Sequence, residues 1–144
     1  MKKFLIVNGP NLNLLGTREP EIYGKESLQD IINLTEKNLT KDGSAVELVW
    51  YQSNIEGELI ERIQKSLAEN FAAVIINPGG YSHTSVALLD ALKMLKCPII
   101  EVHLSNTHRR EEFRSVKLTA KASTIIMEGL GKHAYYFAIK SQLI

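Results

Sequence analysis

The fold of this chain is decided by residues 72–90, AAVIINPGGYSHTSVALLD. Ala72–Ile76 is an uncharged apolar run, which is typical of a strand buried on both faces of a parallel sheet. The run ends at Asn77–Gly80, where proline removes a backbone donor and the glycines allow backbone angles that other residues avoid. The pair Thr84–Ser85 can then cap a helix over Val86–Leu95. The stretch therefore predicts a strand, a tight turn and a helix.

The turn after this strand gathers several groups that do chemistry. It contains an amide, two backbone N–H groups, a hydroxyl and an imidazole, contributed by Asn77, Gly79, Gly80, Ser82 and His83. In an open α/β sheet such a turn lies at the carboxyl end of the strands, which is where ligands bind. We therefore expect this turn to form one wall of an active site.

The composition is that of one globular domain. The chain has 144 residues, 44% of them hydrophobic, and its formal net charge of +1 gives no case for a nucleic acid or membrane partner. The apolar run that begins the sequence stops at Asn8, too early for a signal peptide, and no stretch has the ~18 apolar residues of a membrane span. A single cysteine, Cys97, excludes an internal disulfide and fits a reducing compartment. These features predict a single catalytic domain, residues 1–144, in the cytoplasm.

The rest of the chain alternates strand and helix patterns. Further strands are expected at Phe4–Val7, Val46–Trp50, Pro98–Val102 and Thr124–Met127. Further helices are expected from a capping box at Ser27–Asp30 to Gly43, from Asn54 as cap to Leu67, and after Gly129–Gly131 to Ile139. The connection from His103 to Ser123 has room only for a short charged helix near Arg110–Arg114.

Five strands separated by helices predict an α/β fold with a parallel sheet and right-handed crossovers. The half-apolar pattern of Val46–Trp50 places that strand at an edge, which favours a three-layer flavodoxin-like fold with strand order 2-1-3-4-5. In that order the first, third and fourth strands are neighbours. The loops that follow them, residues 8–24, 77–83 and 103–105, then meet in one crevice.

Three segments from these loops resemble the signature segments of type II 3-dehydroquinate dehydratases. They read NGPNLNLLGTREPEIYG at residues 8–24, INPGGYSHTS at residues 76–85, and EVHLSN and HRREEFR within residues 101–114. The resemblance implies a flavodoxin-like fold, a homo-oligomer that is a dodecamer built from trimers, and a reaction without metal or cofactor. Gly80, where many members have alanine, and Val116–Leu118 depart from the family pattern.

The resemblance also implies a reaction. Members of this family remove water from 3-dehydroquinate to give 3-dehydroshikimate, by anti elimination through an enolate, in the shikimate or quinate pathway. Removing a proton beside a ketone requires a base, expelling hydroxide requires an acid, and the enolate oxygen requires hydrogen-bond donors.

The catalytic roles follow from matching these segments. The resemblance implies Tyr23 as the proton acceptor, Arg18 as the transition-state stabiliser and Asn11 as the residue that orients a stabilising water. Arg18 is five residues from Tyr23, and its permanent positive charge favours a phenolate. His103 matches the family's proton donor. Glu101, two residues earlier on the same strand face, favours the imidazolium form of that histidine.

The binding residues come from the same matching. Contacts to a polyhydroxy carboxylate are implied for Asn77, His83, the backbone of Leu104, Ser105 and Arg114. Asp90 is a carboxylate on an otherwise apolar helix. The resemblance implies that Asp90 reaches the active site of a neighbouring subunit, so that the oligomer completes each pocket.

Plainer interpretations stand beside these. Without the family, Tyr23 is interpreted as a loop anchor and Arg18 as an exposed partner of Glu19. In the same way His103 is a structural imidazole, Asp90 a cap or a partner of Lys93, and residues 109–114 a charged surface turn. The alternative function is a flavodoxin-like small-molecule or nucleotide-binding module without catalysis. A nucleotide site would need a Gly-rich phosphate loop after the first strand, whereas that loop carries large aliphatic side chains.

Two further classes are disfavoured. A phosphoacceptor domain would need acidic residues at the ends of its strands, where Asn8 and Asn77 stand. A metal hydrolase is disfavoured because His83, Glu101 and His103 lack compact ligand spacing.

Overall fold

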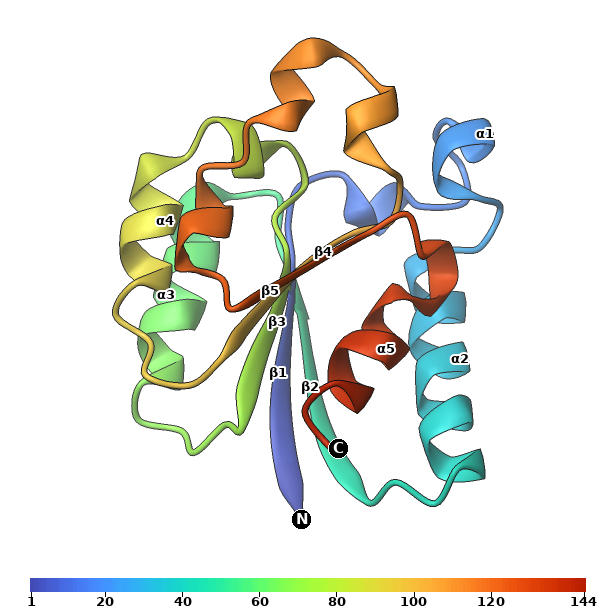
Figure 1. The fold of residues 1–144 in the computed structure, drawn as a ribbon, viewed down its shortest axis with the longest axis vertical. Coiled ribbons are helices and arrows are strands. Elements are labelled where there is room, and N and C mark those ends of the chain that lie inside the picture. The colour runs from blue at the N-terminus through green and yellow to red at the C-terminus, as the bar shows by residue number, and fades with distance from the viewer.

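The computed structural model, which describes residues 1–144, contains one five-stranded parallel sheet (Figure 1). The strands are β1 (Lys2–Asn8), β2 (Val46–Gln52), β3 (Ala73–Asn77), β4 (Ile99–His103) and β5 (Ile125–Glu128). Their order is β2-β1-β3-β4-β5, so the predicted flavodoxin-like topology is confirmed. β2 lies at an edge and is only partly buried along its length, as its half-apolar pattern predicts.

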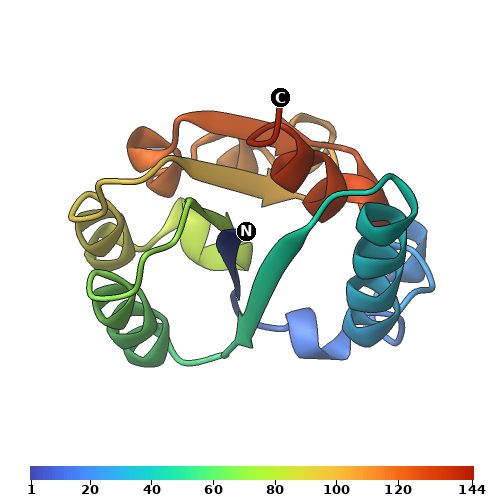
Figure 2. The same cartoon turned by 90° about the horizontal axis from the view of Figure 1, so that it is seen from below.

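Helices cover both faces of the sheet and make three layers (Figure 2). α2 (Leu28–Lys41) and α5 (Ala134–Lys140) lie on one face, and α3 (Glu56–Ser66) and α4 (Val86–Leu92) lie on the other. Phe4 and Ile6 belong to the core beside α2 and α5, whereas Leu5 and Val7 belong to the core beside α3 and α4. Side chains alternate in this way because successive residues of a strand point to opposite faces. None of the helices is both long and apolar enough to cross a bilayer.

The helix starts test the expected caps. The capping box before α2 is confirmed, because Ser27 Oγ accepts from the Asp30 N–H at 3.0 Å while Asp30 Oδ2 accepts from the Ser27 N–H at 3.0 Å. At α4 the cap is Ser85, whose hydroxyl oxygen accepts from the Leu88 N–H at 2.9 Å, and Thr84 takes no part. α4 ends at Leu92, earlier than expected.

The predicted cap of α3 is wrong. Its N-cap position is occupied by Ile55, one residue later than Asn54. The side-chain oxygen of Asn54 instead accepts from the Asn11 N–H at 2.9 Å and from Gln52 Nε2 at 3.1 Å. Asn54 therefore ties the long first loop to the end of β2, a long-range use that local sequence does not reveal.

The connection between β4 and β5 contains no α-helix. Where a short charged helix was expected, it forms three 3₁₀ turns, at Thr107–Arg109, Glu112–Ser115 and Thr119–Ala122. This segment passes over the carboxyl end of the sheet (Figure 1). It is tied down there because the Leu118 N–H donates to the Ser82 carbonyl at 2.7 Å, and the Thr107 N–H donates to Glu128 Oε1 at 3.0 Å.

Candidate active site

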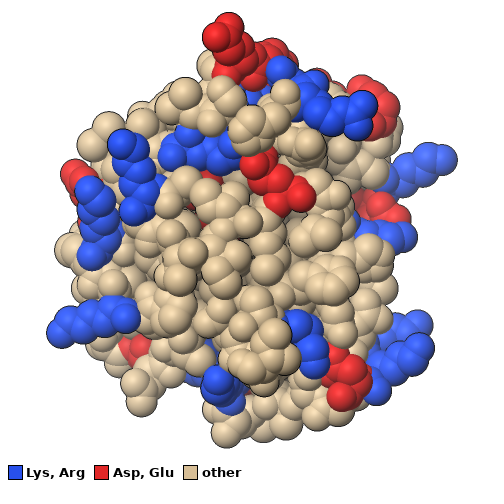
Figure 3. Space-filling model, in the orientation of Figure 1, with Lys and Arg blue, Asp and Glu red and all other residues tan.

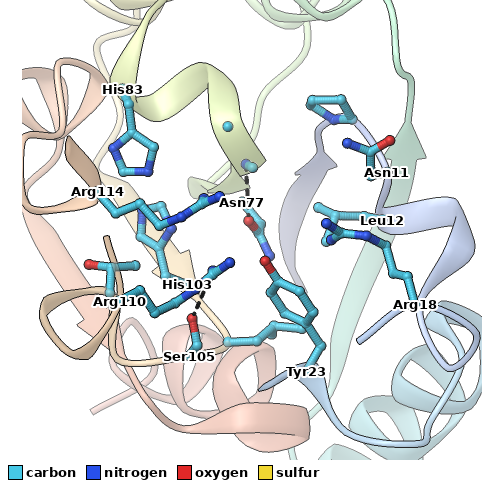
Figure 4. A pocket seen from close by; sticks show the side chains of 15 residues that line it. Asn11, Leu12, Arg18, Tyr23, Asn77, His83, His103, Ser105, Arg110 and Arg114 are labelled. Carbon is cyan, nitrogen blue, oxygen red and sulfur yellow. Dashed lines mark hydrogen bonds between the residues drawn. The ribbon is translucent and has the colours of Figure 1, made fainter. Parts of the chain in front are cut away.

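The three loops expected to meet do meet, in a cavity at the carboxyl end of β1, β3 and β4 (Figure 4). Parallel register makes these strand ends level, since Asn8 is the register partner of Asn77. The cavity is lined by Pro10, Asn11, Leu12, Arg18, Tyr23, Asn77, Gly79, Gly80, His83, His103, Leu104, Ser105, Thr107, Arg110 and Arg114. Nine of the eleven predicted site residues are in this set; Glu101 and Asp90 lie outside it.

Tyr23 lies between two positive charges. It ends the short helix α1 (Pro20–Tyr23). The guanidinium carbons of Arg18 and Arg110 lie 4.8 and 5.1 Å from the centroid of its ring. Arg18 also pairs with Glu19 at 3.5 Å, so the predicted surface pair is present together with the contact to the phenol ring. Both guanidinium groups therefore place positive charge within cation–π distance of this ring.

The sequence leaves open which of Arg109 and Arg110 contributes to the site, and the structure places Arg110 at the cavity. Arg110 follows the Thr107–Arg109 turn, and its Nη1 donates to Ser105 Oγ at 3.4 Å (Figure 4). In the sequence it is one of several charges in what resembles a surface turn. The missing signal was spatial: the turn folds back over the loop that carries Tyr23.

The imidazole of His103 contacts a buried carboxylate, that of Glu101. The two side chains share a face of β4, and His103 Nε2 lies 2.7 Å from Glu101 Oε2. Glu101 is fully buried and also accepts from Ser82 Oγ at 3.0 Å and from Thr119 Oγ1 at 2.5 Å. These hydrogen bonds satisfy the buried carboxylate and fix the orientation of the His103 ring beside it. Glu101 therefore supports the cavity without lining it.

The hydroxyl groups of Ser82 and Thr119 bind Glu101 and do not line the cavity. Ser82 was expected in the wall of the site, but it is fully buried and its hydroxyl points to Glu101. Thr119 was not selected at all, although it is also buried on the same carboxylate. The signal available in the sequence was Glu101 itself, because a carboxylate on an inner strand needs hydroxyl or N–H donors around it.

His83 is presented as a neutral imidazole. Its Nδ1 lies 2.7 Å from the Val116 carbonyl oxygen, which can only accept, so Nδ1 carries the proton and Nε2 has a free lone pair. Burial lowers the pKa of His83, and the nearby charges of His103, Arg114 and Lys117 lower it further, against the effect of the Val116 hydrogen bond. The ring stacks near that of His103, with centroids 6.3 Å apart. His83 can therefore accept a hydrogen bond from a ligand hydroxyl.

The other predicted residues divide into those at the cavity and one outside it. Asn11 has a left-handed backbone, with φ of 69°, and lines the cavity from the first loop. The side chain of Asp90 is exposed on α4 and forms neither an ion pair nor a hydrogen bond within its own chain, so the pairing with Lys93 does not occur. Gly80 departs from the family pattern without consequence, because an added Cβ would have open space around it.

Comparison with known proteins decides the family. The sequence model of the family described as dehydroquinase class II matches residues 2–143 of this chain. The chain belongs to the type II dehydroquinase family. The resemblance drawn from its three loop segments is thereby confirmed.

Relatives and solved structures agree along the whole length of this dehydroquinase chain. A 3-dehydroquinate dehydratase from Lachnoclostridium phytofermentans is 50% identical over 137 residues, which cover 95% of this chain and 93% of that protein. One from Caulobacter vibrioides is 49% identical over 141 residues, which cover 98% and 94%. The crystal structure of the type II dehydroquinase from Butyrivibrio crossotus has a TM-score of 0.93 at 38% identity, covering 99% of this chain and 98% of that one.

Proposed function

We propose that this chain, as one catalytic domain over residues 1–144, removes water from 3-dehydroquinate to give 3-dehydroshikimate in the shikimate pathway. The names of its relatives supply the substrate and the reaction. One observation carries the assignment of roles: a phenol between two guanidinium groups and an imidazole on a buried carboxylate line the same cavity. A base and an acid at one cavity are what an elimination requires.

The first step is the removal of a proton from the carbon beside the ketone. Tyr23 as phenolate takes this proton, and the electron pair moves onto the ketone oxygen to form an enolate. Arg18 and Arg110 stabilise the phenolate before the transfer and the enolate charge after it. Asn11 orients a water that donates to the enolate oxygen.

The second step expels the hydroxyl group from the neighbouring carbon. The enolate collapses, the carbon–carbon double bond forms, the carbon–oxygen bond breaks, and His103 gives its proton to the leaving oxygen so that water departs. The Glu101 carboxylate holds the imidazolium in place until then. Proton transfer from Tyr23 back to His103 through solvent restores both groups. The base comes from α1 and the acid from the end of β4, and these separate positions allow the anti geometry.

The remaining cavity residues bind the carboxylate and hydroxyl groups of the substrate. Asn77, Ser105 and the Leu104 backbone supply an amide, a hydroxyl and main-chain contacts. His83 accepts from a substrate hydroxyl, and Arg114 adds a fixed positive charge. A polar, cationic cavity of this kind fits a polyhydroxy acid with one negative charge.

Turnover of 3-dehydroquinate, followed by the absorbance of the conjugated product, tests the function directly. We expect activity that survives borohydride in the presence of substrate, because none of the cavity residues is a lysine able to form a Schiff base. Activity should also survive chelator treatment, because the chain has no group of three His, Cys, Asp or Glu side chains that could hold a metal ion. A covalent lysine adduct would contradict the mechanism. Binding of the substrate without turnover would favour the alternative, a flavodoxin-like binding module without catalysis.

Assembly is the second part of the proposal. The family resemblance suggests a dodecamer built from trimers, in which Asp90 contacts the substrate of a neighbouring subunit. Exposed apolar side chains fit burial between subunits: Val86 is 57% exposed on α4, beside Asp90, and Phe113 is 59% exposed. In Figure 3 the middle of one face is nearly free of charged side chains, which lie mainly around its margin. Such a face suits contact with another copy.

Asp90→Ala is expected to raise KM about tenfold, because a charged hydrogen-bond partner of the substrate is lost. Lys93→Ala, at the end of the same helix, is the matched control and should leave KM unchanged. Light scattering of the unmodified protein should give the mass of a large symmetric oligomer. A fully active monomer would contradict both parts. The proposal places the enzyme in the cytoplasm, where a lone cysteine remains reduced.

A further inference from the structure

A buried tyrosine joins two strand ends behind the active site. β1 ends at Asn8 and β3 at Asn77, and the two are register partners. Tyr135 of α5 is fully buried. Its hydroxyl oxygen accepts from Asn77 Nδ2 at 3.2 Å, and the hydroxyl donates to Asn8 Oδ1 at 2.5 Å. Neither Tyr135 nor Asn8 lines the cavity, so the proposed mechanism gives them no role.

These hydrogen bonds form a series from Gly79 through Asn77 and Tyr135 to Asn8, and the donor of each one follows from the Gly79 end. The Gly79 N–H can only donate, and it lies 3.2 Å from Asn77 Oδ1, so the amide oxygen of Asn77 faces Gly79 and its nitrogen faces Tyr135. The tyrosine oxygen therefore accepts, and its one proton goes to Asn8. Burial raises the pKa of Tyr135, against the effect of the Asn77 hydrogen bond. The phenol therefore keeps this proton over the pH range in which the enzyme works.

We propose that Tyr135 is a positioning residue for substrate binding, because its hydroxyl fixes the orientation of the Asn77 amide. Asn77 Nδ2 carries two N–H groups, and Tyr135 uses one of them. The other N–H has no partner within the chain, and since Asn77 lines the cavity, we assign this N–H as the donor for the substrate. Without the tyrosine oxygen, the buried amide keeps only the Gly79 N–H as a partner within the chain and loses one of the two hydrogen bonds that fix its orientation. This inference rests on the proposed function, in which Asn77 contacts the substrate.

Tyr135→Phe tests the proposal, because it removes the hydroxyl and keeps the ring that packs edge-on against Trp50 with centroids 5.4 Å apart. We expect KM to rise about tenfold, the effect of one misdirected hydrogen bond, and kcat to change much less. Tyr136→Phe is the matched control. It removes the hydroxyl of the next residue in α5, which donates to Asp42 Oδ2 at 2.7 Å far from the cavity, and it should leave KM unchanged.

A double-mutant cycle separates positioning from a general loss of stability. In an Asn77→Ala background, Tyr135→Phe should raise KM no further, because the amide through which it acts is gone. An unchanged KM in Tyr135→Phe, or the same rise in both backgrounds, would overturn the proposal. If Tyr135→Phe does not fold, the second variant is Asn8→Ala, which removes the acceptor of the Tyr135 hydroxyl proton. KM should then rise several-fold, because the hydroxyl that holds Asn77 is no longer oriented. An unchanged KM in Asn8→Ala would equally overturn the proposal. Failure of the proposed function is recognised separately, as absence of turnover by the unmodified enzyme.

Discussion

Tyr23→Phe is expected to lower kcat on 3-dehydroquinate by about a hundredfold or more, the usual contribution of a general base. The substitution keeps the ring that lies between Arg18 and Arg110 and removes only the oxygen that takes the proton. KM should change little, because the binding residues of the other two loops remain. Tyr136→Phe, a phenol outside the cavity, serves as the control for the loss of a tyrosine hydroxyl.

Arg18, one of the two arginines beside Tyr23, allows a second test of the same role. Arg18→Ala should also lower kcat by about a hundredfold, because the phenolate and the developing enolate both lose a stabilising charge. Arg18→Lys should recover only part of the loss, since an ammonium cannot lie over the ring with the geometry of a guanidinium. If Tyr23→Phe kept full activity, Tyr23 would be the loop anchor of the plainer interpretation and another group would have to be the base.

His103→Ala is expected to depress kcat by about a hundredfold or more, because hydroxide is a poor leaving group without an acid. A substrate analogue with a better leaving group should recover part of this loss and none of the loss in Tyr23→Phe. His133→Ala, an exposed histidine, is the control. An equal recovery in both variants would mean that His103 is not the acid.

The pH dependence of the same reaction follows from these two roles. Tyr23 must be deprotonated and His103 protonated in the active form, so kcat should be bell-shaped in pH. His103→Ala should flatten the alkaline limb, on which the protonated acid is lost. A profile unchanged by this substitution would speak against His103 as the proton donor.

Strand order and the meeting of the three loops could be predicted because they depend on patterns that run along the chain. The uncharged run Ala72–Ile76 and the half-apolar run Val46–Trp50 distinguish an inner strand from an edge strand, and this difference sets the order. The capping box of α2 is equally local, since both of its hydrogen bonds join residues three apart. Local patterns of this kind determine local structure well.

What the sequence could not reveal depends on contacts between distant residues. Asn54 is a good cap by residue type, yet the long first loop uses its side chain, 43 residues away in sequence. Ser82 and Thr119 are ordinary hydroxyl residues until β4 brings Glu101 between them. Arg110 becomes a cavity residue only because the turn after β4 folds back over Tyr23. In each case the partner is fixed by tertiary structure, which residue type and spacing do not encode.

The division of labour between base and acid is tested most directly by exchange of the substrate's proton beside the ketone with deuterium from solvent. The Tyr23 phenolate alone removes this proton, so His103→Ala should still exchange it, faster than it forms product. Tyr23→Phe should show neither exchange nor product formation. Exchange that persists in Tyr23→Phe and disappears in His103→Ala would contradict the account and reverse the two roles.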